Sequence, residues 1–258
     1  MNQDAKHILD AALRDALPGA AVGQALDQIA FQPGGRLILV AAGKAAWEMA
    51  RAAHERLGGR IDAGVVVTKY DYSRGPLGSL EIYEAGHPVP DENSYRATAR
   101  ALEVVSGLTE ADSVLFLLSG GGSALFEQPL IPAEELADIT RQLLACGANI
   151  VEMNTLRKRL SAVKGGRFAL SCAPAHVYAV VLSDIIGDPL DMIASGPAYP
   201  DASTCAQAQE IASRYGLRLS DAARALLGQE TPKELTNVTT FITGLSLIHI
   251  SEPTRPEP

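Results

Sequence analysis

Five small residues in a row, Ser119, Gly120, Gly121, Gly122 and Ser123, follow an apolar run over residues 114–118 of this chain. Consecutive glycines allow positive φ and turn N–H groups inward, and no β-carbon blocks an approaching ligand. A helix beginning near Ala124 would add N-terminal N–H groups that favour negative charge. We therefore predict that this glycine turn binds an anion, with a plain strand-to-helix turn as the alternative.

Lys44 and a pair of aspartates also follow apolar runs. The compact ammonium of Lys44 suits a phosphate, although a solvated lysine is the alternative. Lys44 does not belong to a Walker A motif, because Ala45 follows it and Ile38 stands where the first glycine is required. Asp184 and Asp188 have the carboxylate oxygens that hold Mg²⁺ beside substrate phosphates, or that accept a hydroxyl proton. Capping of the loop through backbone N–H groups is the structural alternative for Asp184.

A basic cluster stands out because the protein as a whole is acidic, with a formal net charge of −8. On a helix, Asn154, Arg157 and Lys158 share one face, and a guanidinium group binds carboxylate or phosphate with two hydrogen bonds. We predict an anion clamp here, with a solvated helix face as the alternative. His87, before Pro88, is a further candidate, and a local hydrogen bond is its alternative role.

The elements that must position these residues alternate along the chain. We predict buried strands over 35–42, 63–68, 80–85, 113–118 and 175–182. Helices are predicted over 4–17, 45–57, 93–108, 132–146, 149–160, 203–215 and 221–227. This alternation predicts an α/β fold, a three-layer sandwich with a mostly parallel sheet. Ligands bind beyond the carboxyl ends of such strands, which places 43–44, 86–87, 119–123 and 183–188 at one rim.

Composition excludes several classes of protein. The negative net charge argues against nucleic acid and anionic membrane as partners, and no apolar run approaches the roughly 20 residues of a membrane span. The N-terminal stretch lacks the apolar core of a signal peptide. Three widely spaced cysteines argue against a disulfide framework or a thiolate metal site, and we expect buried, reduced thiols. A cytoplasmic protein is the expectation that follows.

Five ordered segments resemble the N-terminal domain of the type II glycerate kinases, the glycerate 2-kinase family, some members of which carry the label hydroxypyruvate reductase. They are VAAGKAAWEMA, AGHPVPDENS, LLSGGGSALFEQPL, GANIVEMNTLRKRLSAVKGGRFA and VVLSDIIGDPLDMIASGPAYPDASTCAQA. The resemblance covers roughly residues 4–244. It implies a Rossmann-like domain, followed in the family by a smaller second domain, with the active site between them. It also implies transfer of the γ-phosphoryl group of ATP to the 2-hydroxyl of D-glycerate, with Mg²⁺.

Matched residue by residue, the resemblance implies that Lys44 is the catalytic lysine and that 119–123 is the phosphate- or glycerate-binding turn. Asp184 and Asp188 fall on the family's Ser-Asp-x-x-Gly-Asp loop, as metal ligands or catalytic groups. The family's Asn-x-x-Arg-Lys segment falls on Asn154, Arg157 and Lys158, and Arg159 stands where a histidine is common. Glycerate and a nucleotide are thus the expected ligands, and a homodimer is left open.

The last residues, 245–258, show no helix or strand period and resemble a translated sequencing adapter. We interpret them as a non-native tail, with the family's second domain missing, so that residues 1–244 form the N-terminal domain and activity of this chain alone is uncertain. Two alternatives to the kinase remain. An NAD(P)H-dependent hydroxypyruvate reductase requires a dinucleotide fingerprint, but Leu125 stands at its third glycine. A non-catalytic fragment that only binds ligand is the other.

Overall fold

The computed structural model describes residue 6 and residues 18–182 and 190–243. Its centre is a six-stranded sheet in the order β3-β2-β1-β4-β5-β6, in which every neighbouring pair is parallel. The strands are β1 (Leu37–Ala42), β2 (Ala63–Lys69), β3 (Glu81–Ala85), β4 (Ser113–Leu118), β5 (His176–Leu182) and β6 (Val238–Thr243). This is the strand order of a doubly wound, Rossmann-like sheet, so the predicted fold class is confirmed.

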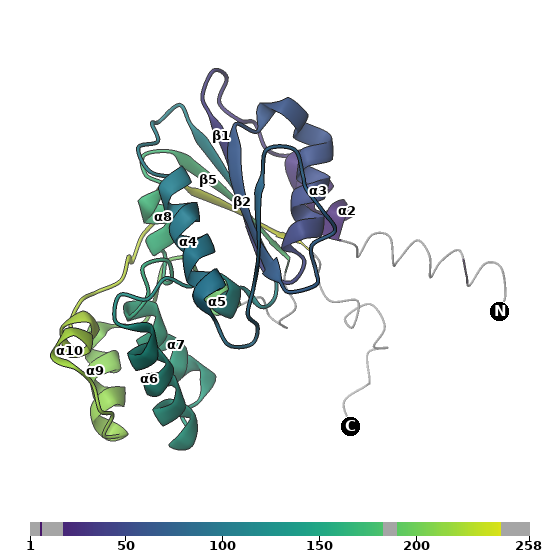
Figure 1. The fold of residues 1–258 in the computed structure, drawn as a ribbon. Coiled ribbons are helices and arrows are strands. Elements are labelled where there is room, and N and C mark those ends of the chain that lie inside the picture. The colour runs from purple at the N-terminus through teal and green to yellow at the C-terminus, as the bar shows by residue number, and fades with distance from the viewer. Residues whose placement is uncertain (1–5, 7–17, 183–189, 244–258) are drawn as a thin grey trace, which may run out of the picture.

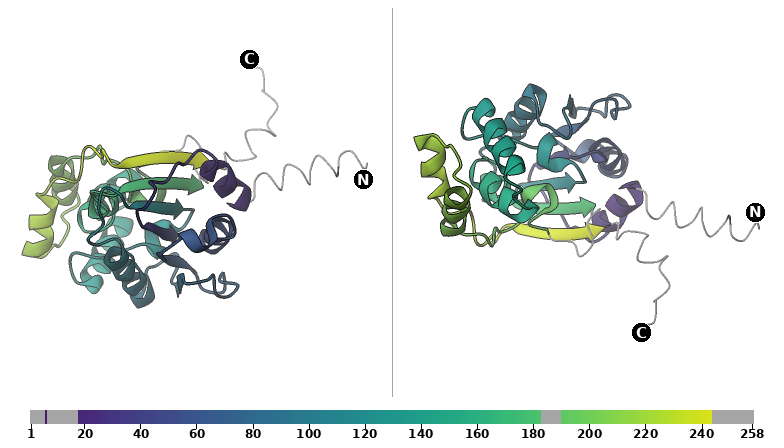
Figure 2. Two further views of the ribbon diagram at one scale, coloured as in Figure 1. Left: turned by 90° about the horizontal axis from the view of Figure 1, so that it is seen from above. Right: turned by 90° about the horizontal axis from the view of Figure 1, so that it is seen from below.

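Helices cover both faces of the sheet (Figures 1 and 2). Each face buries alternate residues of the central strands. On one face, Leu37 and Leu39 of β1 pack with α2 (Pro18–Leu26) and α3 (Ala46–Leu57). On the other face, Ile38 and Val40 pack with α4 (Glu92–Val104) and α8 (Arg167–Ser171). Strands β1 and β4 are buried along their whole length, which explains their continuous apolar sequences.

Four helices form a separate group, here called the helical lobe, which lies beside the sheet in Figure 1. They are α6 (Ala133–Ala145), α7 (Ile150–Arg159), α9 (Cys205–Arg214) and α10 (Asp221–Leu227). Their apolar side chains, among them Ile139, Leu156 and Ile211, form a core of their own. The lobe therefore has its own hydrophobic core and meets the sheet domain through its loops and polar contacts.

Several sequence-based predictions were wrong in detail. Helix α2 begins at Pro18, where we expected a helix to end, and β6 was not predicted. Helix α4 begins directly after its cap Asp91, and α9 directly after its cap Thr204, instead of at residues 93 and 203 as predicted. Of the cysteines, Cys172 is buried, whereas Cys146 is exposed and Cys205 half-buried.

The predicted helix over 4–17 lies outside the described residues, except for residue 6. The same holds for the interpretation of 245–258 as a tail. Within the described ranges, no helix is both long enough and apolar enough to cross a membrane.

Candidate functional site

The candidate site lies where β1 and β4 run side by side and their connections diverge to opposite faces of the sheet. A crevice forms at such a switch point in doubly wound folds, beyond the carboxyl ends of the strands. Lys44 follows β1 and the glycine turn follows β4, and the two are joined by the backbone. The Lys44 N–H donates to the Gly120 carbonyl at 2.9 Å, and the Ala45 N–H donates to Ser119 Oγ at 3.0 Å.

Glycine is required on both sides of this junction. A β-carbon at Gly43, where φ is +126°, would lie 2.2 Å from Ser119 Oγ and 2.5 Å from the Ser119 carbonyl oxygen. At Gly121, where φ is +89°, it would lie 3.1 Å from Lys44 Cγ and 3.0 Å from His87 Cδ2. Side chains at either position would therefore fill the space where the two turns and His87 meet.

Three N–H groups of the glycine turn, those of Gly120, Gly121 and Ser123, donate to no acceptor among the described residues. All three residues are only half-buried, so a ligand can reach them. N–H groups without acceptors around a residue with positive φ form the kind of concavity that suits an anion, and this is the site predicted from the sequence. The expected helix after the turn contributes little, because α5 (Gly122–Leu125) has only four residues and builds no appreciable dipole.

Lys44 and His87 give this space its electrostatic character. The Lys44 side chain is exposed, and its ammonium group forms no hydrogen bond or ion pair with the described residues. Burial, together with the positive charges of Lys44 and Lys69, lowers the pKa of His87 below its usual 6.5. The imidazole is therefore neutral at pH 7, and the net charge facing the turn is positive.

A buried ion pair holds the inner side of the glycine turn. Lys164 and Glu127 are both fully buried, with Lys164 Nζ 3.3 Å from Glu127 Oε2. Lys164 Nζ also donates to the carbonyls of Ser123 at 2.9 Å and Phe126 at 3.0 Å, and burial lowers its pKa to about 8. Two hydrogen bonds from this one buried cation hold both carbonyls, and they therefore fix the end of the turn.

Of the predicted clamp residues of α7, Arg157 contacts the same turn directly and Asn154 contacts it through Ser195. Arg157 Nη2 donates to the Ser123 carbonyl at 3.3 Å, and its Nε is buried without a described partner. Asn154 Oδ1 accepts from Ser195 Oγ at 3.0 Å, and Ser195 Oγ lies 3.3 Å from Ser123 Oγ. Ser195 and its neighbour Ala194 have positive φ of 62° and 51°, a strained conformation of the kind that clusters at functional sites.

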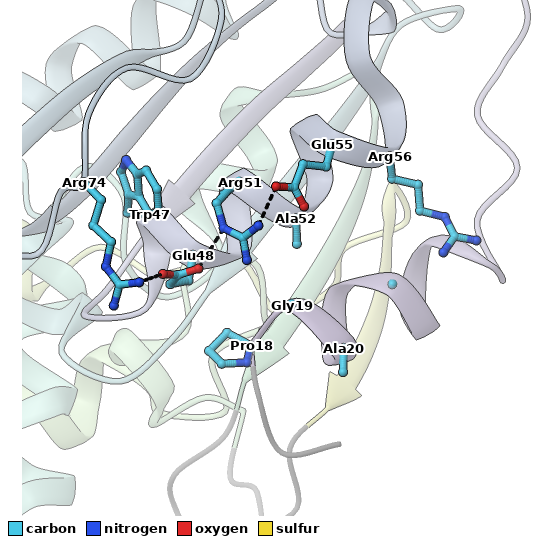
Figure 3. Close-up of a pocket in the computed structure, with 11 residues that line it drawn as sticks. Pro18, Gly19, Ala20, Trp47, Glu48, Arg51, Ala52, Glu55, Arg56 and Arg74 are labelled. Atoms are coloured by element: carbon cyan, nitrogen blue, oxygen red, sulfur yellow. Dashed lines mark hydrogen bonds and ion pairs between the residues drawn. The ribbon is translucent and has the colours of Figure 1, made fainter. Parts of the chain in front are cut away.

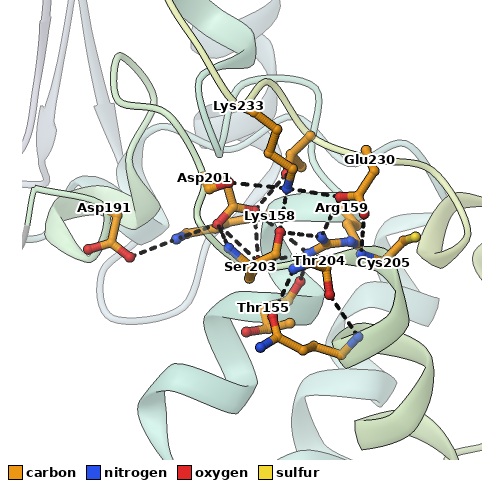
Figure 4. Close-up of polar contacts among 12 residues, drawn as sticks. Thr155, Lys158, Arg159, Asp191, Asp201, Ser203, Thr204, Cys205, Glu230 and Lys233 are labelled. Atoms are coloured by element: carbon orange, nitrogen blue, oxygen red, sulfur yellow. Dashed lines mark hydrogen bonds and ion pairs between the residues drawn. The ribbon is translucent and has the colours of Figure 1, made fainter.

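Lys158, the third predicted clamp residue, is engaged elsewhere (Figure 4). Its ammonium group lies 3.1 Å from Asp201 and 3.2 Å from Asp191, and its side chain is 3% exposed. The adjacent Arg159 is fully buried and also lies near Asp201, at 3.6 Å. Lys158 therefore has its charge balanced by two carboxylates.

The predicted metal ligands, Asp184 and Asp188, lie outside the described residues, as does the whole of segment 183–189. In the part of the chain that the structure describes, no three His, Cys, Asp or Glu side chains gather as a metal site.

A second hollow, of about 920 Å³, lies between α2 and α3 (Figure 3). Each of its charged side chains has a partner: Glu48 pairs with Arg51 at 2.9 Å and with Arg74 at 2.6 Å, Glu55 also pairs with Arg51, and Arg56 pairs with Asp27 outside the hollow. None of the predicted site residues lines it. It therefore offers no unbalanced charge to a ligand.

Sequence reasoning missed three contributors to the site: the support given to the turn by Lys164, the hydroxyl contact of Ser195, and the buried carboxylate of Asp201. In the sequence, Lys164 stands among the basic residues of 157–167 and Asp201 stands just before the predicted helix over 203–215, but neither position reveals its partners. No local pattern marks Ser195, because its position depends on a left-handed backbone that the sequence does not reveal.

Comparison with known proteins places this chain in a family. Residues 4–228 match a family model described as a domain of unknown function, DUF4147. The chain is 53% identical to the D-glycerate 2-kinase of Thermotoga maritima, over 92% of this chain and 57% of that protein. A putative hydroxypyruvate reductase of Agrobacterium vitis is 43% identical, over 88% of this chain and 52% of that protein.

The fold agrees with a solved structure. The crystal structure of a glycerate kinase from Thermotoga maritima superimposes with a TM-score of 0.87 at 52% identity, covering 92% of this chain and 57% of that one. The chain thus spans somewhat more than half the length of these relatives. The resemblance found in the sequence is confirmed, and the chain belongs to the DUF4147 domain family, the N-terminal part of the glycerate 2-kinase family.

Proposed function

We propose that this chain provides the phosphate- and glycerate-binding crevice of an enzyme that phosphorylates D-glycerate at its 2-hydroxyl, using ATP and Mg²⁺. The observation that carries the proposal is the junction of Lys44 with the glycine turn. Lys44, an exposed lysine, lies beside three N–H groups that have no acceptor among the described residues, at the switch point of the sheet. Phosphoryl transfer depends mainly on positioning the reactants and on stabilising negative charge. The fixed backbone of the turn suits the first need, and the lysine and the N–H groups suit the second.

Each proposed role follows from the surroundings of the residue. Lys44 stabilises the transferring phosphoryl group, because its charge is not balanced by a described carboxylate. The N–H groups of Gly120, Gly121 and Ser123 hold a phosphate or the glycerate carboxylate. Ser119 and Gly122 shape the turn, since both are buried and bonded within it.

On α7, Arg157 and Asn154 support the turn from its far side, and Lys158 positions the helix through its two aspartates. Asp184 and Asp188 remain the proposed holders of Mg²⁺, which would neutralise phosphate charge. Arg157 is the one clamp residue still suited to bind an anionic substrate group, because its Nε has no described partner.

The test is a coupled assay of this chain, beside a full-length relative, with D-glycerate, ATP and Mg²⁺. The product is identified by ³¹P NMR, and we expect 2-phosphoglycerate rather than the 3-isomer. Calorimetry with MgATP and D-glycerate on the same sample separates a chain that binds and turns over from one that only binds. Oxidation of NADH by hydroxypyruvate without ATP would instead support the reductase.

The structure offers the reductase little support. Leu125, which stands where a dinucleotide fingerprint needs its third glycine, is fully buried in the core. The glycine turn also follows β4 rather than β1, where the fingerprint of this fold belongs.

A further inference from the structure

His87 is a polar residue at the site to which the proposed function gives no task. It follows β3 at the same rim as Lys44 and the glycine turn. A β-carbon at Gly121 would lie 3.0 Å from His87 Cδ2, 3.1 Å from His87 Nε2 and 3.1 Å from Lys44 Cγ. The imidazole, the lysine stem and the turn therefore meet at a single point.

The ring of His87 has no structural role that explains this position. Neither ring nitrogen forms a hydrogen bond with any residue that the structure describes, so the local hydrogen bond considered from the sequence is not found there. The charged groups around it are Lys44 and Lys69, both cationic. The nearest carboxylate on its own loop, Asp91, accepts hydrogen bonds from Tyr70 and Ser94 instead.

These surroundings keep the imidazole unprotonated. Two cations and partial burial lower the pKa of His87, and no described carboxylate compensates. A neutral imidazole has one nitrogen that donates and one that accepts a proton. It lies beside N–H groups that have no acceptor among the described residues, and it is therefore a base next to the position where an anionic substrate would lie.

Resting on the proposed function, we propose that His87 contacts the acceptor substrate and is the general base for its hydroxyl group. With the glycerate carboxylate on the N–H groups of the turn, the 2-hydroxyl faces the ring. A bond forms between the 2-oxygen and the γ-phosphorus while the bond from that phosphorus to the bridging oxygen breaks and ADP leaves. The hydroxyl proton passes to the free ring nitrogen of His87. A base in this position contributes on the order of 10²–10⁴ in rate.

His176 is a matched control. Burial lowers its pKa as well, but it is the first residue of β5, at the opposite end of the sheet, and its Nε2 lies 2.8 Å from Thr239 Oγ1. The first experiment follows both imidazole Cε1–H signals by NMR in this chain, with D-glycerate as the probe, and His87→Gln assigns the signal. We expect glycerate to shift the His87 signal and raise its midpoint, and to leave His176 unchanged.

The second experiment is the pH profile of kcat in the kinase assay. We expect the wild-type kcat to fall below its plateau as pH drops beneath 6.5, because His87 becomes protonated. His87→Gln should lack this acid limb, and its kcat should be lower than that of the wild type by about 10²-fold or more. His176→Gln should keep the acid limb and the wild-type kcat.

The outcomes separate the two proposals. If glycerate binds and is phosphorylated but the His87 signal does not move, or if His87→Gln keeps the acid limb, the role of His87 is refuted and the kinase stands. If D-glycerate neither binds nor reacts, the proposed function fails and the role of His87 fails with it.

Discussion

Lys44 is an exposed cation at the candidate site, and its ammonium group is accessible to a ligand. Its backbone is fixed by the bond to Gly120, yet its ammonium group stays free of the described carboxylates. A side chain held only through its backbone contributes little to folding, so its replacement should affect chemistry far more than stability.

We therefore expect Lys44→Ala to lower kcat by about 10²–10³, as the loss of one preorganised charge in a transition state does. The thermal unfolding midpoint should stay within about 2 °C of the wild type, because a surface substitution away from any contact costs within ±0.5 kcal/mol. A steady-state assay and a melting curve on the same preparation measure both. Retention of near wild-type turnover would reject this role.

Lys164 presents the opposite case, a fully buried cation. Removing it alone leaves the Glu127 carboxylate buried without its partner, which typically costs about 3–5 kcal/mol. Lys164→Met should therefore reduce the free energy of unfolding at pH 7 by that order, and the double variant Lys164→Met/Glu127→Gln should recover most of the loss.

The pH dependence of stability gives a second signature of Lys164. Its pKa is about 8 in the folded chain against 10.5 for the unfolded reference, so the unfolded state binds more protons between these values. The wild type should thus gain stability as pH rises from 8 to 10.5, relative to Lys164→Met. Urea unfolding across this range tests it, and parallel stability curves for the two proteins would contradict it.

At the scale of elements, the backbone conformation of the glycine turn determines how closely neighbouring side chains can approach it. Gly121 and Gly107 both have positive φ, of 89° and 65°, but only Gly121 has neighbours within 4 Å of an added β-carbon. Both substitutions to alanine should cost about 1 kcal/mol of stability through backbone strain. Gly121→Ala alone should also displace His87 or Lys44 and weaken binding of MgATP or D-glycerate at least tenfold, as calorimetry can measure. Equal affinities in the two variants would count against the turn as the binding element.

The sequence predicted the elements that carry a strong local signal. Strand β4 was found because a buried apolar run ends in glycines, and the strand-end rule then placed Lys44 beside the turn. Strand β6 was missed because it is an edge strand, with a half-exposed sequence that has no buried run. Helix α2 was missed because Pro18 was interpreted as a terminator, although proline also suits the first helical turn.

Tertiary partners could not be predicted in the same way. Nothing local to Lys158 indicates that its ammonium group pairs with Asp201, 43 residues later, instead of a ligand. Three adjacent basic residues of α7 form different sets of hydrogen bonds. Arg157 bonds to the glycine turn, Lys158 to Asp191 and Asp201, and Arg159 to the carbonyls of Thr155 and Ser203. These different partners result from the packing of α7 against two other segments of the chain, which the local sequence does not reveal.

At the scale of the whole molecule, α7 belongs both to the helical lobe and to the site. Asp201, fully buried, receives hydrogen bonds from Lys158 at 3.1 Å, Thr231 at 2.7 Å and Ser203 at 2.8 Å. This carboxylate thus ties α7 to the segments that enter and leave the lobe. Although burial alone would raise its pKa, the bond from Thr231 and the charge of Lys158 lower it.

We expect Asp201→Asn to loosen the lobe without disturbing the sheet, because the lobe has a hydrophobic core of its own and the strands do not depend on this carboxylate. Amide hydrogen exchange should quicken in α7, α9 and α10 and stay unchanged in β1 and β4. Because the pKa of Asp201 is lower in the folded chain than in the unfolded chain, its ionised carboxylate stabilises the fold above the unfolded pKa, and this stabilisation is lost as pH falls through the folded pKa. The variant lacks this carboxylate, so it should lose less stability in acid below about pH 4. Asp221→Asn, at an exposed aspartate of the same lobe, is the matched control.

Asp201→Asn should also weaken the binding of D-glycerate at the glycine turn, although Asp201 does not lie there. On the helix that Asp201 holds, Arg157 bonds to Ser123 of the glycine turn and Asn154 bonds to Ser195 beside it, so a displaced α7 weakens both contacts. We expect the Kd for D-glycerate to rise in Asp201→Asn and not in Asp221→Asn, even though neither aspartate lies at the glycine turn. Faster exchange in α7 with an unchanged Kd would show that the lobe and the crevice are independent, and the turn would then be held by Lys164 alone.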